Sequence, residues 1–339
     1  MTPLSEYEKD ILQQSNALND QFNYELPVAL HTLNLQSYDR IILAGMGSSD
    51  YALIPIERAL IMHGFPIWRI DAGRLLDMPD LITSNSLLWM TSQSGMSGEV
   101  VKLLDIMAKP KTLLAVTNDI NSTLAQRADI VVELRSGSEA TVSSKSYLNT
   151  LVASYRLLNI LTGQADQPLV DKLALQLHEV NERVARQPLV QPIADSFFLR
   201  KQPKLVMIGM GADAATAMTG ALITKESSKV SAEGFIGGEF RHGPMETSGD
   251  QMTALLFGDG SEPTLIQLAE DLLGNGTQVI TIGPKAYAGS ELLQTPGDDE
   301  LQRLLFAMIY VQQLTVALAK GNGMVPGEFL YGKKITVTL

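Results

Sequence analysis

Short runs of consecutive apolar residues recur along the chain and alternate with longer segments in which apolar residues return every three or four positions. The runs predict strands buried on both faces, and the longer segments predict helices between them. This alternation is typical of parallel sheets covered by helices on both sides. The predicted strands are 41–44, 67–71, 87–90, 113–117 and 130–134 in the first half, and 205–208, 230–232, 252–257 and 279–282 in the second.

The predicted helices lie between these strands and before the first of them. A leading helical region covers residues 6 to 32, where Ile11, Leu18 and Phe22 are spaced as on one helix face. A linker with its own helical stretch is expected within 163–203. The remaining predicted helices are 49–63, 98–108, 144–161, 212–228, 262–273 and 299–320.

One sequence pattern occurs twice. Residues 41–49 read IILAGMGSS and residues 205–213 read LVMIGMGAD, so each is a strand followed by Gly-Met-Gly and a helix start. We interpret them as two copies of one doubly wound α/β fold, each a five-stranded parallel sheet flanked by helices. Ligands of such folds bind at the carboxyl ends of the strands.

Composition and charge narrow the function. The 339 residues suit two domains, and the absence of cysteine excludes disulfides and thiolate chemistry. The net charge of −11 argues against a nucleic-acid surface. The polar N-terminus and the lack of a long apolar segment predict a cytoplasmic protein without a membrane span. The four histidines lack metal-ligand spacing, so we expect no metal and no cofactor.

The first candidate loop follows the strand 41–44. It reads Gly45-Met46-Gly47-Ser48-Ser49, which offers a close backbone approach, two hydroxyls and a helix N-terminus to an anion. The alternative is a tight turn in which Ser49 only caps the helix. The dinucleotide fingerprint is not present, because its third glycine would fall at Asp50.

The second candidate loop follows the strand 87–90 and reads SQSGMSGE from residue 92. Three serines and a glutamine at the start of a helix form a hydroxyl-rich loop that suits a phosphate without any cation. The alternative is an ordinary loop rich in serine and glycine in which Ser97 caps the helix. We expect this loop to lie beside the first at one edge of the sheet.

These two loops resemble those of the sugar isomerase (SIS) domain family, which read G-x-G-T/S-S and S-x-S-G-E/x-T/S. The pattern is most similar to the isomerase half of glucosamine-6-phosphate synthase and to the fructoselysine and glucoselysine 6-phosphate deglycases. The resemblance implies a flavodoxin-like fold. It also implies that the phosphate ligands are Ser48, Ser49, Ser92, Gln93, Ser94 and Ser97.

Residues 137–146 resemble the family's E-x-x-V-A-S-T-K segment, which lines the sugar. The resemblance places Thr141 and Ser143 near sugar hydroxyls. The alternative is a helix start capped by Ser143 or Ser144.

Residues 219–245 resemble the family's catalytic block, which ends in G-E-x-x-H-G-P. Glu226 matches the residue that moves a proton between C1 and C2, a task that a raised pKa would favour. His242 matches the histidine that opens the sugar ring. Structural roles are expected for Glu233 and Glu239. The family's Schiff-base lysine falls at Ile223, which argues against an imine route.

The last residues resemble the family tail whose lysine closes over the sugar. Lys333 is the preferred match, and Lys334 is one position away. The alternative is a solvated basic tail.

The resemblance implies a domain plan of residues 1–34 as a helical segment, 35–165 as a first SIS domain, 195–325 as a second, and 326–339 as the tail. We expect no glutaminase domain in this chain. The implied function is an isomerase acting on a hexose 6-phosphate, or a deglycase acting on a 6-phosphorylated sugar–amine adduct. We expect a homodimer or dimer of dimers with a shared active site. The alternative is a non-catalytic sugar-phosphate-binding protein.

Overall fold

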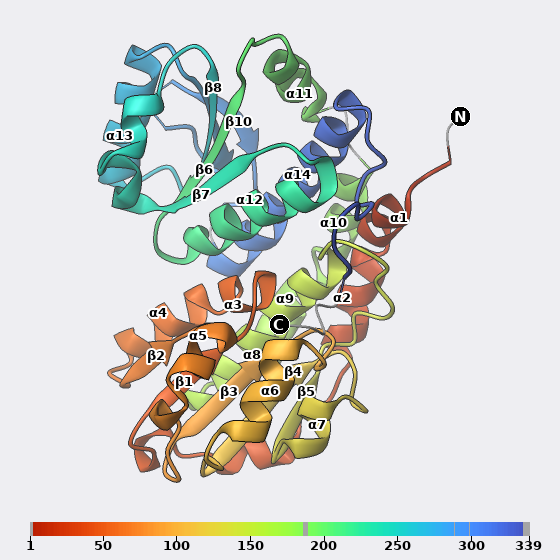
Figure 1. The fold of residues 1–339 in the computed structure, drawn as a ribbon, viewed down its shortest axis with the longest axis vertical. Helices are drawn as coiled ribbons and strands as arrows, with labels where there is room; N and C mark the ends of the chain where they lie inside the picture. The colour runs from red at the N-terminus through yellow and green to blue at the C-terminus, as the bar shows by residue number, and fades with distance from the viewer. Residues whose placement is uncertain (1–2, 186–188, 288, 298, 335–339) are drawn as a thin grey trace. The chain divides into compact units, whose positions relative to one another are not determined.

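A computed structural model describes residues 3–185, 189–287, 289–297 and 299–334. Apart from these gaps, the chain forms two compact units, and each unit is built from three separate stretches of the sequence (Figure 1). The first-sheet unit comprises residues 13–139, 145–177 and 331–334. The second-sheet unit comprises residues 3–12, 140–144 and 178–330.

The first-sheet unit contains a five-stranded sheet in the order β2-β1-β3-β4-β5, and all its strand pairs are parallel. The strand order runs outward in opposite directions from the neighbours β1 and β3. This is the topological switch point, beside which ligands of doubly wound folds bind. The strands are β1 (Ile41–Ala44), β2 (Ile67–Arg69), β3 (Leu87–Thr91), β4 (Thr112–Thr117) and β5 (Ile130–Glu133).

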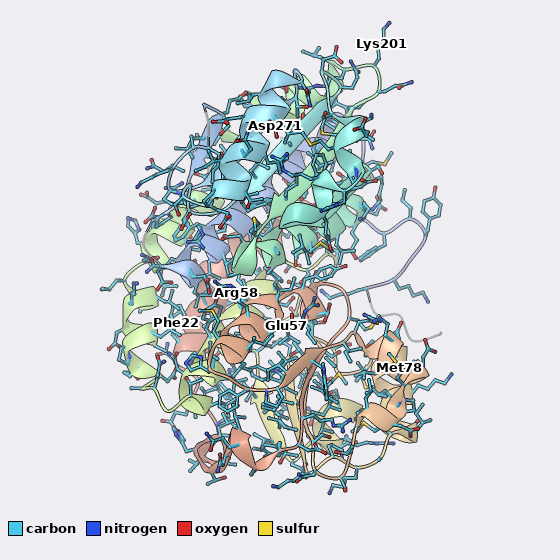
Figure 2. The ribbon with its side chains drawn as sticks, turned by 90° about the vertical axis from the view of Figure 1, so that its left-hand side faces the viewer. Phe22, Glu57, Arg58, Met78, Lys201 and Asp271 are labelled. Atoms are coloured by element: carbon cyan, nitrogen blue, oxygen red, sulfur yellow. The ribbon has the colours of Figure 1, made fainter. Side chains whose placement is uncertain are left out.

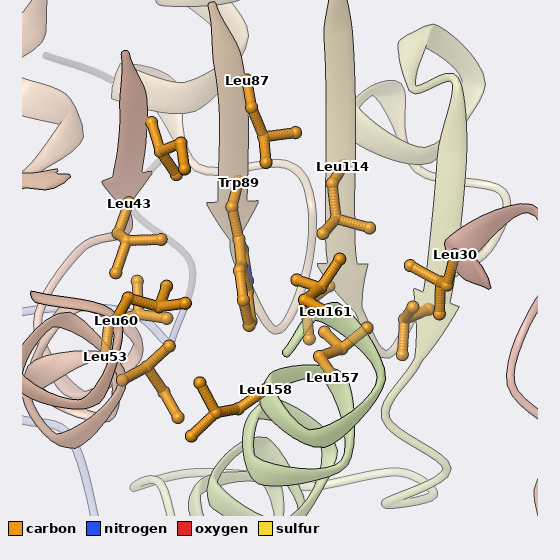
Figure 3. Packing of buried hydrophobic residues seen from close by; sticks show 14 of the residues in the cluster. Leu30, Leu43, Leu53, Leu60, Leu87, Trp89, Leu114, Leu157, Leu158 and Leu161 are labelled. Atoms are coloured by element: carbon orange, nitrogen blue, oxygen red, sulfur yellow. The ribbon is translucent and has the colours of Figure 1, made fainter. Parts of the chain in front are cut away.

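Alternate residues of these strands supply two separate cores, one on each face of the sheet. On one face Leu43, Trp89 and Leu114 pack against Leu157 and other residues of α8 (Lys145–Leu161), as Figure 3 shows. The opposite-facing residues pack against α5 (Ala72–Asp77), α6 (Gly98–Ile106) and α7 (Thr123–Arg127). Burial on both faces explains why the strands read as continuous apolar runs.

The second-sheet unit repeats the topology, in the order β10-β9-β8-β6-β7 with parallel pairs. The predicted strand 230–232 is wrong in position, because Lys229 adopts a left-handed conformation and the strand begins at Ala232. The fifth strand, β10, was not predicted. The strands are β6 (Lys204–Gly209), β7 (Ala232–Ile236), β8 (Met252–Phe257), β9 (Gln278–Gly283) and β10 (Glu291–Gln294).

The remaining helices follow the predicted alternation, with one exception. The predicted helix 49–63 is two helices, α3 (Ser48–Tyr51) and α4 (Ile54–Met62), because the chain turns at Ala52 and Leu53. The others are α1 (Glu6–Leu12), α2 (Gln14–Phe22), α9 (Gln167–Ala174), α10 (Leu177–Val184), α11 (Gln191–Phe198), α12 (Ala214–Ser228), α13 (Pro263–Gly274) and α14 (Glu300–Gly321).

The helix α14 is apolar along most of its length. It is long enough to cross a membrane, but 89% of its most apolar window is buried inside the protein. It packs against α12, so its composition is that of a core helix. The predicted spans 35–165 and 195–325 each contain one of the two sheets, and the domain boundaries themselves stay a prediction.

Candidate functional site

The loop after β1 is held in a tight turn by its glycines. A side chain at Gly45 would lie within 2.8 Å of the Asp50 backbone nitrogen, and Gly47 has a φ of 54°, which favours glycine. The turn leads directly into α3, which carries Ser48 and Ser49. Both serines are half-buried, and neither side chain has a hydrogen-bond partner among the described residues. Their hydroxyls are therefore available to a ligand.

The loop after β3 lies beside the loop after β1, because the two strands are neighbours with Ala44 in register with Met90. Ser92 Oγ accepts a hydrogen bond from the Gly95 backbone at 3.2 Å. Ser94 Oγ accepts one from the Met96 backbone, also at 3.2 Å. A serine hydroxyl that accepts from the backbone still has its own proton to donate. The loop is therefore preorganised to donate hydrogen bonds to an oxyanion.

The predicted cap Ser97 does not cap its helix. It occupies the N-cap position of α6, yet its side chain makes no capping hydrogen bond, and its Oγ is shielded from solvent without a partner within the described chain. A buried unpaired hydroxyl costs free energy unless a ligand or water completes it. Its position at a helix N-terminus, where N–H groups also lack partners, favours an anion.

A charged cluster lies behind the first loop. Asp50, in the helix that begins with Ser48, is buried and paired with Arg69 at the end of β2. Arg69 Nε also donates to Glu57 of α4 at 3.0 Å. Burial raises the pKa of Asp50, although Arg69 opposes this. Arg69 thus offsets negative charge close to the hydroxyls predicted to bind phosphate.

Thr141 and Ser143 lie in the short segment 140–144, which belongs to the second-sheet unit. Both are half-buried. A side chain at Gly327 would lie 2.9 Å from Thr141 Oγ1 and 2.4 Å from Tyr7 Cβ, so the backbone packs closely over this threonine.

Glu226 lies in the last turn of α12 and is half-buried. The next lysine, Lys229, donates through Nζ to the Glu226 backbone oxygen and to that of Glu328. Desolvation lowers the pKa of Lys229, opposed by Glu226 and Glu328. Ile223, where the family has its lysine, is fully buried in the core. No Schiff base can form at an isoleucine.

His242 is exposed and ends a 3-10 helix of residues Gly237–Arg241, which follows β7. Glu239 Oε2 accepts from the Ile236 backbone at 3.2 Å, which fits the structural role expected for that residue. Arg241 pairs at 2.7 Å with Asp271, which Figure 2 labels on α13. This ion pair fastens the chain next to His242.

The two tail lysines differ in their contacts. Lys334 Nζ donates to Glu139 Oε2 at 2.8 Å, and Glu139 also accepts from the Ser146 hydroxyl and backbone at 2.6 and 3.1 Å. Burial raises the pKa of Glu139, but Lys334 and Ser146 outweigh it and hold that pKa below 4.5. Lys333 is exposed. Sequence reasoning missed the Glu139 contact, although Glu139 begins the sugar-lining motif.

The structure thus groups the predicted residues by unit. The six phosphate-loop residues belong to the first-sheet unit, together with Lys333. Thr141, Ser143, Glu226 and His242 belong to the second-sheet unit. Among the described residues, no three His, Asp or Glu side chains are arranged to hold a metal ion.

Comparison with known proteins finds a family match within the second-sheet unit. The family model of the SIS domain matches residues 198–287, from the end of α11 to the loop after β9. The chain is therefore similar to the SIS domain over these residues. This span includes Glu226 and His242.

A glutamine–fructose-6-phosphate aminotransferase (isomerizing) of Clostridium acetobutylicum is 24% identical over 325 residues, which are 90% of this chain and 52% of that protein. A relative of the same name from Thermus thermophilus is 28% identical over 308 residues, or 88% of this chain and 49% of the relative. The chain therefore spans about half the length of these relatives.

Among solved structures, the C-terminal domain of glucosamine-fructose-6-phosphate aminotransferase from Francisella tularensis superposes with a TM-score of 0.81 at 18% identity. The match covers 96% of this chain and 99% of that domain. At this identity the likeness establishes the fold of nearly the whole chain.

Proposed function

We propose that this chain binds a hexose 6-phosphate or its amino derivative and acts at C1–C2 of the sugar. One observation carries the proposal: two serine-rich loops leave adjacent parallel strands at the switch point of the first sheet, and the shielded Ser97 hydroxyl there has no partner among the residues that the structure describes. A phosphate dianion offers the acceptor oxygens that such donors lack.

The phosphate site in this proposal consists of Ser48, Ser49, Ser92, Gln93, Ser94 and Ser97. It holds the anion with hydroxyls and with the N–H groups at the start of α6. Arg69 makes the phosphate site more favourable for an anion, because it offsets the negative charges of Asp50 and Glu57. The chain then binds an anion despite its net charge of −11.

In the proposed chemistry Glu226 is the base that moves a proton between C1 and C2. His242 assists ring opening, or protonates the leaving nitrogen of an adduct, and Lys333 screens charge at the sugar. Thr141 and Ser143 contact sugar hydroxyls. An isomerase would exchange aldose and ketose. A deglycase would consume water and release sugar phosphate and free amine.

The proposal has an oligomeric and an architectural part. Residues 35–165 would be a second SIS domain of the same topology, in tandem with the matched one. The chains would form a homodimer or dimer of dimers with a shared active site, in the cytoplasm. The exposure of His242 within one chain is consistent with a histidine that serves a partner's site.

The test is turnover of a panel that contains fructose 6-phosphate, glucosamine 6-phosphate and 6-phosphorylated fructosamine and glucosamine-type amino acid adducts. Wild type is compared with Glu226→Gln, and Glu233→Gln is the control, because Glu233 is an exposed glutamate of the same block. We expect release of amine or interconversion of sugars that only Glu226→Gln abolishes. Saturable binding without turnover in wild type would refute the catalytic role and leave a sugar-phosphate-binding protein.

A further inference from the structure

Within the first-sheet unit, the tail residue Lys334 contacts the buried carboxylate of Glu139. Glu139 is 7% exposed, and its carboxylate accepts from Lys334 Nζ at 2.8 Å across 195 residues of sequence. The neighbours Tyr331, Gly332 and Lys333 are exposed. The tail residue fixed by this contact is therefore Lys334.

The Glu139 carboxylate that binds Lys334 is held in place by further hydrogen bonds. Glu139 stands before α8, and Ser146, the second residue of that helix, donates to it through both its hydroxyl and its backbone N–H. A carboxylate at a helix N-terminus is stabilised by the helix dipole. The 17-residue helix packs on the sheet through Leu157 and its neighbours, so the carboxylate has little freedom to follow a moving tail.

We propose that Lys334 is a positioning residue that latches the C-terminal tail to Glu139, and that this latch presents the adjacent Lys333 to the sugar. The two lysines then have different tasks: one holds the tail, and the other meets the ligand. The role of Lys333 rests on the proposed function, whereas the latch itself is measurable without any ligand.

The latch can be tested by a distance measurement between two spin labels. The chain has no cysteine, so labels at Tyr331→Cys and Lys102→Cys are the only ones attached. Tyr331 is 99% exposed, and Lys102 is an exposed residue of α6 in the same unit. In the otherwise unchanged chain we expect a narrow distance distribution between the labels.

Lys334→Met should broaden this distribution, and Lys334→Arg should restore the narrow one. Because Lys334→Met leaves the buried Glu139 carboxylate without this cation and can impair folding, Lys334→Met with Glu139→Gln is the second variant. It should also release the tail. Lys333→Met is the matched control, with the same substitution one position away, and should leave the distribution narrow. A broad distribution in the unchanged chain, or a narrow one in both Lys334→Met variants, would overturn the latch.

Activity separates the two lysines. Lys333→Met should lower kcat although the tail stays in place. Lys334→Met should lower kcat/KM by about a hundredfold, because it displaces the Lys333 ammonium, and a shift of about an ångström in a group that contacts the substrate has an effect of this size. Lys334→Arg should recover most of this loss. Wild-type protein that turns over no substrate would refute the proposed function and leave the distance measurement to decide the latch. An active enzyme in which Lys334→Met retains full kcat/KM would refute the positioning role.

Discussion

Arg303 donates hydrogen bonds of 2.9 and 2.8 Å to the two carboxylate oxygens of Asp213, and both side chains are buried. In the repeated Gly-Met-Gly pattern, Asp213 occupies the position of Ser49. The first loop thus presents a hydroxyl where the second has an internal ion pair. The two halves share a topology but differ in the chemistry at their switch points.

Asp213→Ala should destabilise the fold without weakening ligand binding. Removal of one partner of a buried pair leaves an uncompensated charge, which costs about 3–5 kcal/mol. Urea unfolding measures the loss of free energy. The double variant Asp213→Leu with Arg303→Met should lose less than Asp213→Ala alone. A loss below about 1 kcal/mol in Asp213→Ala would contradict a structural role for the pair.

Ser97→Ala should weaken binding of a hexose 6-phosphate by about tenfold to a hundredfold, the effect of a hydrogen bond to a charged group. Its free energy of unfolding should not fall, because no protein hydrogen bond is lost and a shielded unpaired hydroxyl is removed. Titration calorimetry measures the affinity. Ser86→Ala is the matched control: this buried serine precedes β3, at the opposite end of the strand, and bonds Thr83 through its hydroxyl. The control should lose about 1 kcal/mol of stability and keep its affinity.

Glu139 makes the stability of the fold depend on acid. Its folded-state pKa is depressed, so its contribution is fully present above the unfolded value of 4.5 and is lost as the pH falls through the lower folded value. Glu139→Gln should flatten that part of the curve of unfolding free energy against pH. The urea midpoints of both proteins, followed from neutral to acidic pH, provide the comparison. Parallel curves would show that Glu139 titrates alike in folded and unfolded chains.

Arg241→Ala should lower turnover while leaving the melting temperature nearly unchanged. Its pair with Asp271 is partly exposed and therefore adds little to the free energy of unfolding, but it holds the chain beside His242. Arg127→Ala is a suitable control, because Arg127 pairs with Asp105 at 2.6 Å on the surface of the other unit. Equal turnover in the two variants would show that the Arg241 pair does not position His242.

The buried strands were predictable from sequence because their position in the fold imposes an unusual pattern. Strands β1 and β8 pack on both faces, so every residue in 41–44 and 252–257 is buried and apolar or hydroxylated. Strand β10 lies at the edge of its sheet, and only one of its four residues is buried. Its sequence lacks an apolar run, which is why it was not predicted.

The candidate site was only partly predictable for a related reason. The loops at 45–49 and 92–97 are local, so glycine and serine spacing identifies them without a structure. The pair Glu139–Lys334 depends on residues 195 positions apart, and no local pattern connects them. Ser97 is a different case, because its position in the sequence fits a helix cap. Only the structure shows that its hydroxyl makes no capping hydrogen bond.

The separation of Glu139 and Lys334 along the chain also sets a delay between the translation of the two residues. At about 5–20 residues per second, a ribosome needs about 10 to 40 s to add the 195 residues that separate them. During that time the newly made first-sheet unit contains the Glu139 carboxylate, but Lys334 has not yet been translated. The latch can therefore close only after Lys334 has been made, and a chain terminated before that residue would leave this carboxylate without its lysine.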